Sequence, residues 1–230
     1  MIGGDDPTQA PGSTAKAADP PLMPGTVVQS YRITQVIGQG GMGRVYRAVH
    51  VKLERPVALK VLHASTARDR GAVGRFFDEA RAVNRVRNEH IVEVTDFLEP
   101  EGGPVCTVME LLEGETLGAV LARGPLAWRD AAVIAHQVAR ALAATHDAGI
   151  VHRDLKPDNV FLTERDGARW VKVLDFGVAK LTGHDDVVVG TPAFMAPEQL
   201  QGEHVDGRAD VWALGVLLFV MIEGRRPFAG

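Results

Sequence analysis

Hydrophobic and polar positions divide the chain into a part with short, strand-like patterns and a part with helical patterns. In the first part, apolar positions alternate or run together briefly over residues 31–37, 44–49, 57–62, 91–98 and 105–111. One helical pattern interrupts these strands at residues 73–86, where Phe76, Ala80 and Val83 fall on a common face. The first part therefore predicts a sheet accompanied by one helix.

From Leu112 onward the pattern is mainly helical. Apolar side chains recur every third or fourth residue over residues 134–145, and Gly149 is expected to end that helix. A second apolar run, residues 211–222, is too short to cross a bilayer and is expected to form a buried helix. Strands followed by helices predict an α+β architecture of two lobes. We divide these lobes as residues 25–111 and 112–230.

Residues 1–24 differ in composition from the rest of the chain. They contain five of the 13 prolines, with Gly, Ala, Asp and Thr between them and almost no large apolar groups. Such a segment cannot bury enough surface to offset the entropy that it would lose on ordering. We therefore predict a disordered leader.

Composition and charge exclude several classes of function. Hydrophobic residues make up 46% and charged residues 23% of the chain, which is ordinary for a soluble globular protein. A formal net charge of −4 argues against a general binder of nucleic acids or anionic membranes. The single cysteine, Cys106, excludes an internal disulfide and suits a reducing compartment. Asp5, Asp6 and the nearby prolines leave no signal peptide, so we expect a cytoplasmic location.

The candidate chemistry lies in residues 152–159, His-Arg-Asp-Leu-Lys-Pro-Asp-Asn, and in residues 175–177, Asp-Phe-Gly. Two carboxylates, an amide and a lysine at this spacing suit the transfer of a phosphoryl group from a metal-bound triphosphate to a hydroxyl. Asp154 would orient the hydroxyl and take its proton, while Lys156 would neutralise the moving phosphoryl group. Asn159 and Asp175 would supply hard oxygen ligands for magnesium.

These motifs resemble those of the protein kinases, and the resemblance runs from about Tyr31 to the last residue. It implies the two-lobed protein-kinase fold, with an antiparallel β-sheet and one helix in the N-terminal lobe and a mainly helical C-terminal lobe. It also implies ATP and Mg²⁺. Lys156, two residues after Asp154, is typical of serine/threonine-directed members. Residues 40–43, Gly-Gly-Met-Gly, and 190–200, Gly-Thr-Pro-Ala-Phe-Met-Ala-Pro-Glu-Gln-Leu, resemble the bacterial (Hanks-type) branch.

The glycine-rich segment 38–43 has two interpretations. It fits the dinucleotide fingerprint G-x-G-x-x-G, but that fingerprint requires a helix to begin at the glycines. Residues 44–49 instead alternate like a strand, which favours a hairpin whose backbone amides lie over phosphates. The residues expected to contact nucleotide here are Gly38, Gln39, Gly40, Gly41 and Gly43.

The resemblance assigns further positions around the nucleotide. Lys60 corresponds to the phosphate-binding lysine, and Val45 and Ala58 to the walls of the adenine pocket. Met109 corresponds to the gatekeeper, and Glu110 and Leu112 to the segment that joins the lobes and meets adenine.

Lys60 also needs an anionic partner. We assign it to Glu79, which lies near the apolar face of its helix. Asp78 and Glu89 are the competing acids.

Two features depart from the family. Thr182 is the only hydroxyl between Gly177 and Gly190, so we hypothesise that Asp185 or Asp186 supplies the negative charge that Arg153 would otherwise find in a phosphate. The alternative is that both aspartates are simply solvated.

The second departure is that the chain stops after its apolar helix, whereas the family continues through several more helices. One of these supplies an arginine for the glutamate that corresponds to Glu198. We expect a C-terminally truncated domain, and a membrane tether beyond residue 230 stays open.

The leading hypothesis is an ATP-dependent serine/threonine protein kinase that acts on protein substrates in bacterial signal transduction. Its rival is a non-catalytic, pseudokinase-like nucleotide-binding or scaffolding fragment. The expected partners are protein substrates and ATP, and not nucleic acid. The resemblance leaves open a homodimer, formed for autophosphorylation or through the N-terminal lobes.

Overall fold

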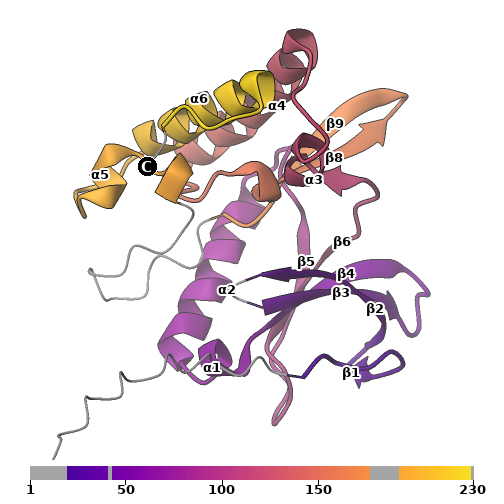
Figure 1. Ribbon diagram of the computed structural model, residues 1–230. Coiled ribbons are helices and arrows are strands. Elements are labelled where there is room, and N and C mark those ends of the chain that lie inside the picture. The colour runs from indigo at the N-terminus through magenta and orange to yellow at the C-terminus, as the bar shows by residue number, and fades with distance from the viewer. Residues whose placement is uncertain (1–19, 41–42, 177–191, 229–230) are drawn as a thin grey trace, which may run out of the picture.

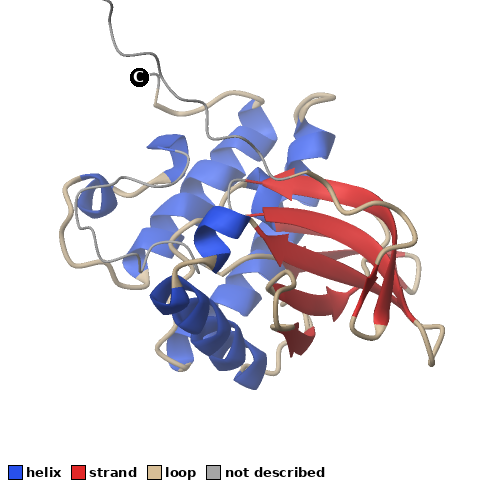
Figure 2. Ribbon diagram, turned by 90° about the horizontal axis from the view of Figure 1, so that it is seen from below, coloured by secondary structure: helices blue, strands red, loops and turns tan. Residues whose placement is uncertain are grey.

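A computed structural model describes residues 20–40, 43–176 and 192–228. A sheet-containing lobe and a mainly helical lobe lie one above the other, as the α+β prediction requires (Figure 1). Seen from below, the strands of the large sheet gather on one side and most helices on the other (Figure 2). The chain passes from one lobe to the other after strand β6.

The first lobe is built on a six-stranded antiparallel sheet in the order β1-β2-β3-β4-β6-β5. Its strands are β1 (Val27–Val28), β2 (Tyr31–Gly40), β3 (Gly43–His50), β4 (Pro56–Leu62), β5 (Val94–Leu98) and β6 (Cys106–Glu110). The five predicted strands are all present, with one clear difference. The strand predicted from residue 91 begins only at Val94, because Ile91 instead forms a bridge with Val173 of the other lobe.

The helical part of this lobe consists of α1 (Ala64–Ala67) and α2 (Arg70–Arg85). Asp69 caps α2, because its carboxylate accepts hydrogen bonds from the backbone N–H groups of Gly71 and Ala72 at 2.9 and 3.0 Å. The predicted face of α2 is buried, including Phe76, Ala80 and Val83. This burial positions α2 against the sheet and beside the gap between the lobes.

The second lobe combines helices with a small three-stranded sheet in the order β7-β8-β9. Its elements are β7 (Glu115–Thr116), α3 (Leu117–Leu121), α4 (Trp128–Asp147), the 3-10 turn η1 (Pro157–Asn159), β8 (Val160–Arg165), β9 (Ala168–Val173), the 3-10 turn η2 (Pro192–Phe194), α5 (Pro197–Leu200) and α6 (Arg208–Glu223). Gly149, at φ 75°, adopts the left-handed conformation two residues after α4, which confirms the predicted end of that helix.

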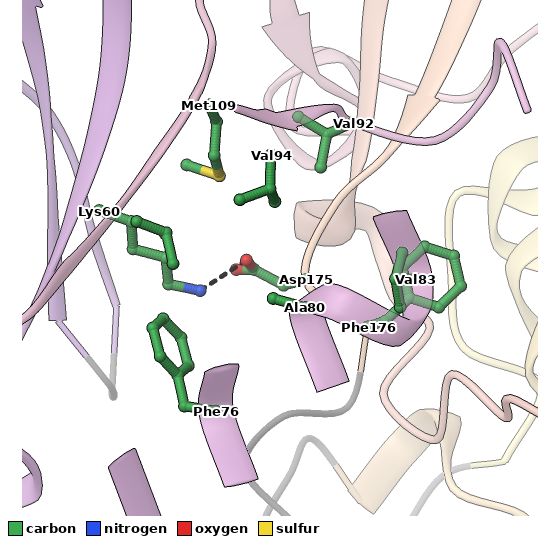
Figure 3. Close-up of a pocket in the computed structure, with 10 residues that line it drawn as sticks. Lys60, Phe76, Ala80, Val83, Val92, Val94, Met109, Asp175 and Phe176 are labelled. Atoms are coloured by element: carbon green, nitrogen blue, oxygen red, sulfur yellow. Dashed lines mark hydrogen bonds and ion pairs between the residues drawn. The ribbon is translucent and has the colours of Figure 1, made fainter. Parts of the chain in front are cut away.

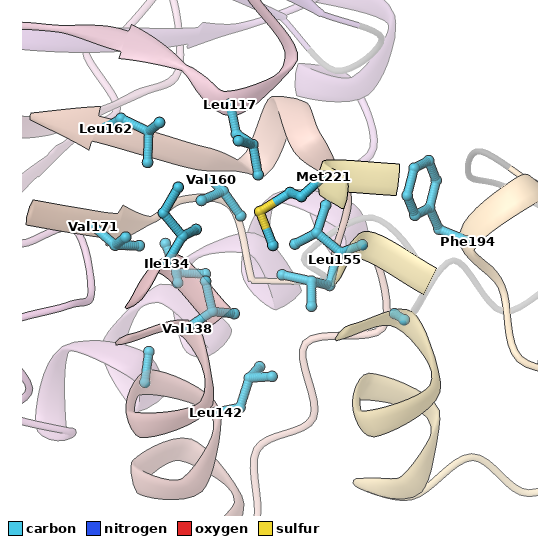
Figure 4. Close-up of a cluster of buried hydrophobic side chains, with 14 of the residues drawn as sticks. Leu117, Ile134, Val138, Leu142, Leu155, Val160, Leu162, Val171, Phe194 and Met221 are labelled. Atoms are coloured by element: carbon cyan, nitrogen blue, oxygen red, sulfur yellow. The ribbon is translucent and has the colours of Figure 1, made fainter. Parts of the chain in front are cut away.

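The core of the second lobe forms where α4, α6 and the β8–β9 hairpin meet (Figure 4). Ile134 and Val138 of α4 and Met221 of α6 are fully buried there. The opposite side of α6 is open, since the Val211 side chain is 63% exposed. The predicted apolar helix is therefore buried on one side only. Within the described residues, no helix is long and apolar enough to cross a membrane.

The last part of the predicted leader is packed. Leu22 lies against the core of the first lobe, and its backbone N–H donates to the Tyr46 hydroxyl at 3.0 Å. The composition of residues 1–24 suggested disorder because large side chains are rare there. Leu22 is one of the few large apolar side chains in this segment, and it packs against the apolar core of the first lobe. Residues 1–19 lie outside the described part of the chain.

Candidate active site

Lys60 and Asp175 meet across the gap between the lobes. Lys60 extends from β4 of the first lobe, and Asp175 follows β9 of the second lobe. The Lys60 Nζ atom lies 2.5 Å from Asp175 Oδ1 (Figure 3). Lys60 is only 7% exposed, and Asp175 offsets the cost of burying its ammonium group. The two side chains that the sequence assigned to one site therefore converge.

The pKa of the Asp175 carboxyl is held below its ordinary value. Burial between the lobes pushes this pKa upward, but the charge and hydrogen bond of Lys60 outweigh it, and the charge of Lys156 acts in the same direction. The Asp175 side chain is nevertheless 46% exposed, so solvent screens these charges in part. Asp175 is therefore ionised at neutral pH and able to interact with cations.

Asp154, Lys156 and Asn159 form a compact polar group in the second lobe. Lys156 Nζ lies 3.0 Å from Asp154 Oδ2. The Asn159 side-chain amide donates to the Asp154 carbonyl at 2.8 Å and to Asp154 Oδ2 at 3.2 Å. Because these described contacts engage Oδ2, the other carboxylate oxygen is left to accept a hydrogen bond from a bound hydroxyl. The arrangement suits the orientation of an acceptor hydroxyl.

Asn159 and Asp175 are brought together by the β8–β9 hairpin. Asn159 directly precedes β8, and the Leu174 N–H donates to its carbonyl at 2.8 Å, which places Asp175 alongside. Among the described residues, no group of three or more His, Cys, Asp or Glu side chains is arranged to hold a metal. One carboxylate and one amide oxygen nevertheless fit Mg²⁺, which commonly takes one or two protein ligands and completes its shell with phosphate oxygens and water. The residues present therefore fit the ion that the sequence implied.

Asp210 supports the loop that carries Asp154. Its side chain is 1% exposed and accepts hydrogen bonds from the backbone N–H groups of His152 and Arg153, both at 2.8 Å. His146 lies 2.7 Å from the same carboxylate. Arg153 has the left-handed backbone angle φ 63°, an unfavourable conformation for a residue with a side chain. Asp210 thus holds a strained turn directly before Asp154.

His152 is a structural residue. It is fully buried, its Nε2 lies 3.1 Å from the Leu174 carbonyl, and its ring packs against Phe176 with centroids 4.7 Å apart. Burial lowers its pKa and keeps the ring neutral. Phe176, Val83 and Val94 also line a small apolar cavity of about 40 Å³ next to Lys60 (Figure 3).

The glycine-rich segment is a strand–turn–strand hairpin. Gly38, Gln39 and Gly40 of β2 pair with Val45, Arg44 and Gly43 of β3. No helix begins at the glycines, so the dinucleotide fingerprint is excluded. Gly41 lies outside the described residues.

Gly43 has a packing role that the sequence did not reveal. A Cβ atom built on Gly43 would lie 2.0 Å from the Val61 carbonyl oxygen of β4, whereas a Cβ on Gly40 would meet nothing within 4 Å. Gly43 therefore permits the close approach of β3 and β4 just after Lys60, in addition to any contact with phosphates.

We expect Gly43→Ala to lower the free energy of unfolding by about 2 kcal/mol, because the added methyl group must push two paired strands apart. Gly40→Ala in the same hairpin should change it by less than about 0.5 kcal/mol. Urea denaturation of both variants measures the difference. Equal stabilities would contradict the packing role of Gly43.

The remaining nucleotide-binding candidates border the same gap. In the sheet, Val45 pairs with Lys60 and Ala58 pairs with Met109, and Met109 lines the apolar cavity beside Lys60. Leu112 is partly buried in the segment that joins the lobes.

Glu110 has a second role that sequence reasoning missed. Its carboxylate accepts from the Glu93 N–H at 2.9 Å and pairs with Lys172 Nζ of β9 at 2.6 Å. Lys172 also donates to the Ile91 carbonyl at 3.2 Å. The pair thus ties the segment between the lobes to the second lobe. No local pattern could have indicated this contact, because the two residues lie far apart in the sequence.

We expect Lys172→Met to lower the free energy of unfolding by about 2 kcal/mol, since charge-assisted hydrogen bonds between partly buried groups contribute about that much. Lys52→Met, at an exposed position of the β3–β4 turn, is the matched control and should have little effect. Chemical denaturation of both proteins compares them. A loss no greater for Lys172→Met than for Lys52→Met would show that the ion pair contributes nothing.

The competing acids of α2 and the following loop are engaged elsewhere. Asp78 is exposed and pairs with Arg81, while Glu89 pairs with Arg140 and Arg165. The backbone of Glu79 lies in α2, but its side chain is outside the described part, so its pairing with Lys60 stays a prediction.

The predictions for Thr182, Asp185 and Asp186 also fall outside the described residues.

Comparisons with known proteins agree with this geometry. The sequence pattern of a family described as "Protein kinase domain" matches residues 31–230. The chain is 47% identical over 218 residues to serine/threonine-protein kinase Pkn1 of Myxococcus xanthus, covering 92% of this chain and 31% of that protein. It is 39% identical over 216 residues to serine/threonine-protein kinase PknL of Mycobacterium tuberculosis, covering 91% of this chain and 53% of that protein. The chain thus spans about a third to a half of the length of these relatives.

A solved structure also resembles the fold. A crystal structure of the PknI kinase domain of Mycobacterium tuberculosis, in a double-mutant form, superimposes with a TM-score of 0.76 at 31% sequence identity. The match covers 91% of this chain and 79% of that chain. The sheet-containing lobe and the helical lobe therefore have the protein-kinase fold.

Proposed function

Because this chain belongs to the protein kinase family, we propose that it transfers the γ-phosphoryl group of ATP to serine or threonine hydroxyls of protein substrates. The relatives named above are serine/threonine-protein kinases, and they support this choice of substrate class. In the reaction, the bond between the β,γ-bridging oxygen and the γ-phosphorus breaks. A new bond forms to the acceptor oxygen, whose proton is released.

The observation that carries the proposal is the meeting of Lys60 and Asp175 across the gap between the lobes. A buried ammonium and a carboxylate held by two different lobes suit a triphosphate bound between them. Lys60 would face its α- and β-phosphates, and Glu79 is proposed to hold Lys60 in that direction. Asn159 and Asp175 would bind magnesium, which neutralises charge on the phosphates.

Asp154 and Lys156 would act on the acceptor side. Asp154 would orient the hydroxyl and accept its proton. Lys156, 3.0 Å from Asp154, would face the charge that develops on the transferred group. Because phosphoryl transfer depends mostly on positioning and charge neutralisation, these two residues contribute chiefly through where they are held.

The nucleotide itself would lie under the β2–β3 hairpin. Backbone amides of the glycine-rich segment would contact the phosphates, and the segment after β6 would contact adenine. The proposed nucleotide contacts are Gly38, Gln39, Gly40, Gly41, Gly43, Val45, Ala58, Met109, Glu110 and Leu112. A reaction that consumes ATP also supports a cytoplasmic location for this part of the protein.

The test is a phosphotransfer assay on the purified chain with γ-labelled ATP, magnesium and a protein substrate rich in serine and threonine. We expect label on serine or threonine and none on tyrosine, and loss of the label with Asp154→Asn. Nucleotide binding without transfer would instead favour the non-catalytic alternative. Failure to bind ATP at all would overturn the proposal.

A further inference from the structure

A second and larger cavity lies in the first lobe, away from the gap between the lobes. Its volume is about 460 Å³, within the range of about 300–1,000 Å³ that is usual for small-molecule sites. Its floor consists of buried side chains, among them Tyr46 and Val61 of the sheet and Val105 directly before β6. Pro20 and Leu22 form one wall, in the segment that passes beside α1 before β1 (Figure 1).

The interior of this cavity is apolar. Tyr46 carries the only side-chain hydroxyl among the described lining residues, and that oxygen already accepts a hydrogen bond from the Leu22 N–H at 3.0 Å. Apart from Arg44, His63 and Arg68, the other side chains that line the cavity are hydrocarbon, with Ala64 and Ala67 of α1 at the rim. Transfer of the apolar part of a small or medium-sized molecule from water into this cavity would therefore be favourable.

The charged residues at the cavity have a single sign. Arg44 and Arg68 line it, and the described lining residues include no Asp or Glu. This is unusual in a chain whose net charge is −4. The positive potential of two guanidinium groups favours an anionic group at the rim.

The cavity borders the proposed nucleotide site through His63. The His63 ring lies 3.2 Å from the Gly40 carbonyl of the glycine-rich hairpin, measured from Nε2. Arg44, on the same wall, belongs to the strand that continues this hairpin. A molecule in the cavity would thus touch residues that also support the phosphate-binding segment.

We propose that this cavity binds a free small-molecule organic carboxylate, with its apolar body on the Tyr46 floor and its anionic head near Arg44 and Arg68. The apolar walls select the body, and the paired positive charges select a carboxylate over a neutral group of the same shape. Through His63 and the hairpin, its occupancy is linked to the affinity for ATP.

The binding test compares naphthoate with naphthamide, a neutral probe of nearly the same shape, by calorimetric titration of the purified chain without nucleotide. Naphthoate should bind with one-to-one stoichiometry, and naphthamide about fivefold more weakly, which is the size of an exposed charge interaction. No binding of naphthoate at millimolar concentration, or equal binding of the two probes, would overturn the proposal.

Variants locate the site. Arg68→Gln should lower the affinity for naphthoate by about fivefold and leave the affinity for naphthamide unchanged. Arg70→Gln removes an exposed arginine that does not line the cavity, so it should alter neither probe. Ala64→Phe fills the cavity from an exposed rim position, so it should abolish the binding of both naphthoate and naphthamide. An unaltered naphthoate affinity in Arg68→Gln would place the binding elsewhere and overturn the assignment.

The linkage to ATP rests on the proposed function and is tested separately. Saturating naphthoate should change the dissociation constant of ATP by at least about fivefold, the lower end of ordinary coupling between two sites. The naphthoate titration needs no nucleotide, so failure to bind ATP would count against the proposed function alone. An unchanged ATP affinity beside normal naphthoate binding would overturn the linkage.

Discussion

Asp175→Asn is expected to reduce phosphoryl transfer by at least about a thousandfold, the upper range for loss of one pre-positioned charged group. The substitution keeps the size of the side chain but removes the charge that pairs with the buried Lys60. It also removes the single carboxylate of the proposed magnesium site. Turnover of γ-labelled ATP at saturating magnesium and substrate measures the loss.

Asp166→Asn is a closely matched control for this experiment. Asp166 and Asp175 have similar left-handed backbone angles, φ 52° and 45°, which asparagine tolerates well. Asp166 is 95% exposed at the tip of the β8–β9 hairpin, so its replacement should leave turnover unchanged. If Asp175→Asn retained turnover comparable to that of Asp166→Asn, the role assigned to Asp175 would be wrong.

Asp210→Ala is expected to cost about 4 kcal/mol of folding stability. The Asp210 carboxylate is buried and accepts from two backbone N–H groups, and each such donor left unpaired costs about 1–3 kcal/mol. His146 loses its partner as well. Because Asp210 also holds Arg153 in its strained conformation, we expect activity to fall even at temperatures where the variant is folded.

Asp147→Ala serves as the control for Asp210→Ala. Asp147 is an exposed aspartate at the end of α4, and its loss should change stability by less than about 0.5 kcal/mol. Urea denaturation gives both values, and assays on the folded fraction separate activity from stability. An Asp210→Ala protein as stable and active as Asp147→Ala would show that the buried carboxylate does not support the loop.

Local patterns were enough to predict most elements of the fold. The alternation in residues 44–49 distinguished a hairpin from a dinucleotide-binding turn, and β3 confirms it. The repeat in residues 134–145 and Gly149 predicted the last turns of α4 and its end. These patterns succeed because hydrogen-bonding geometry and side-chain periodicity act over a few residues.

Other features depend on residues that are distant in the sequence. The strand predicted from Ile91 was too long, because Ile91 forms a β-bridge with Val173 in the other lobe. The contact between Glu110 and Lys172 has no local signal at either residue. Gly43 was assigned to phosphate binding, whereas its close contact with Val61 of β4 became apparent only in the paired strands.

The sequence by itself determined the two-part architecture and the candidate residues of the proposed site, including Lys60, Asp154, Asn159 and Asp175. Their identities and spacing reflect the chemistry that they would perform. Only the tertiary structure decided that Lys60 and Asp175 meet, that Asp210 supports the loop before Asp154, and that a basic-rimmed apolar cavity lies beside α1. The reason is physical, since such contacts arise when packing of the two lobes brings together groups that no short-range periodicity relates.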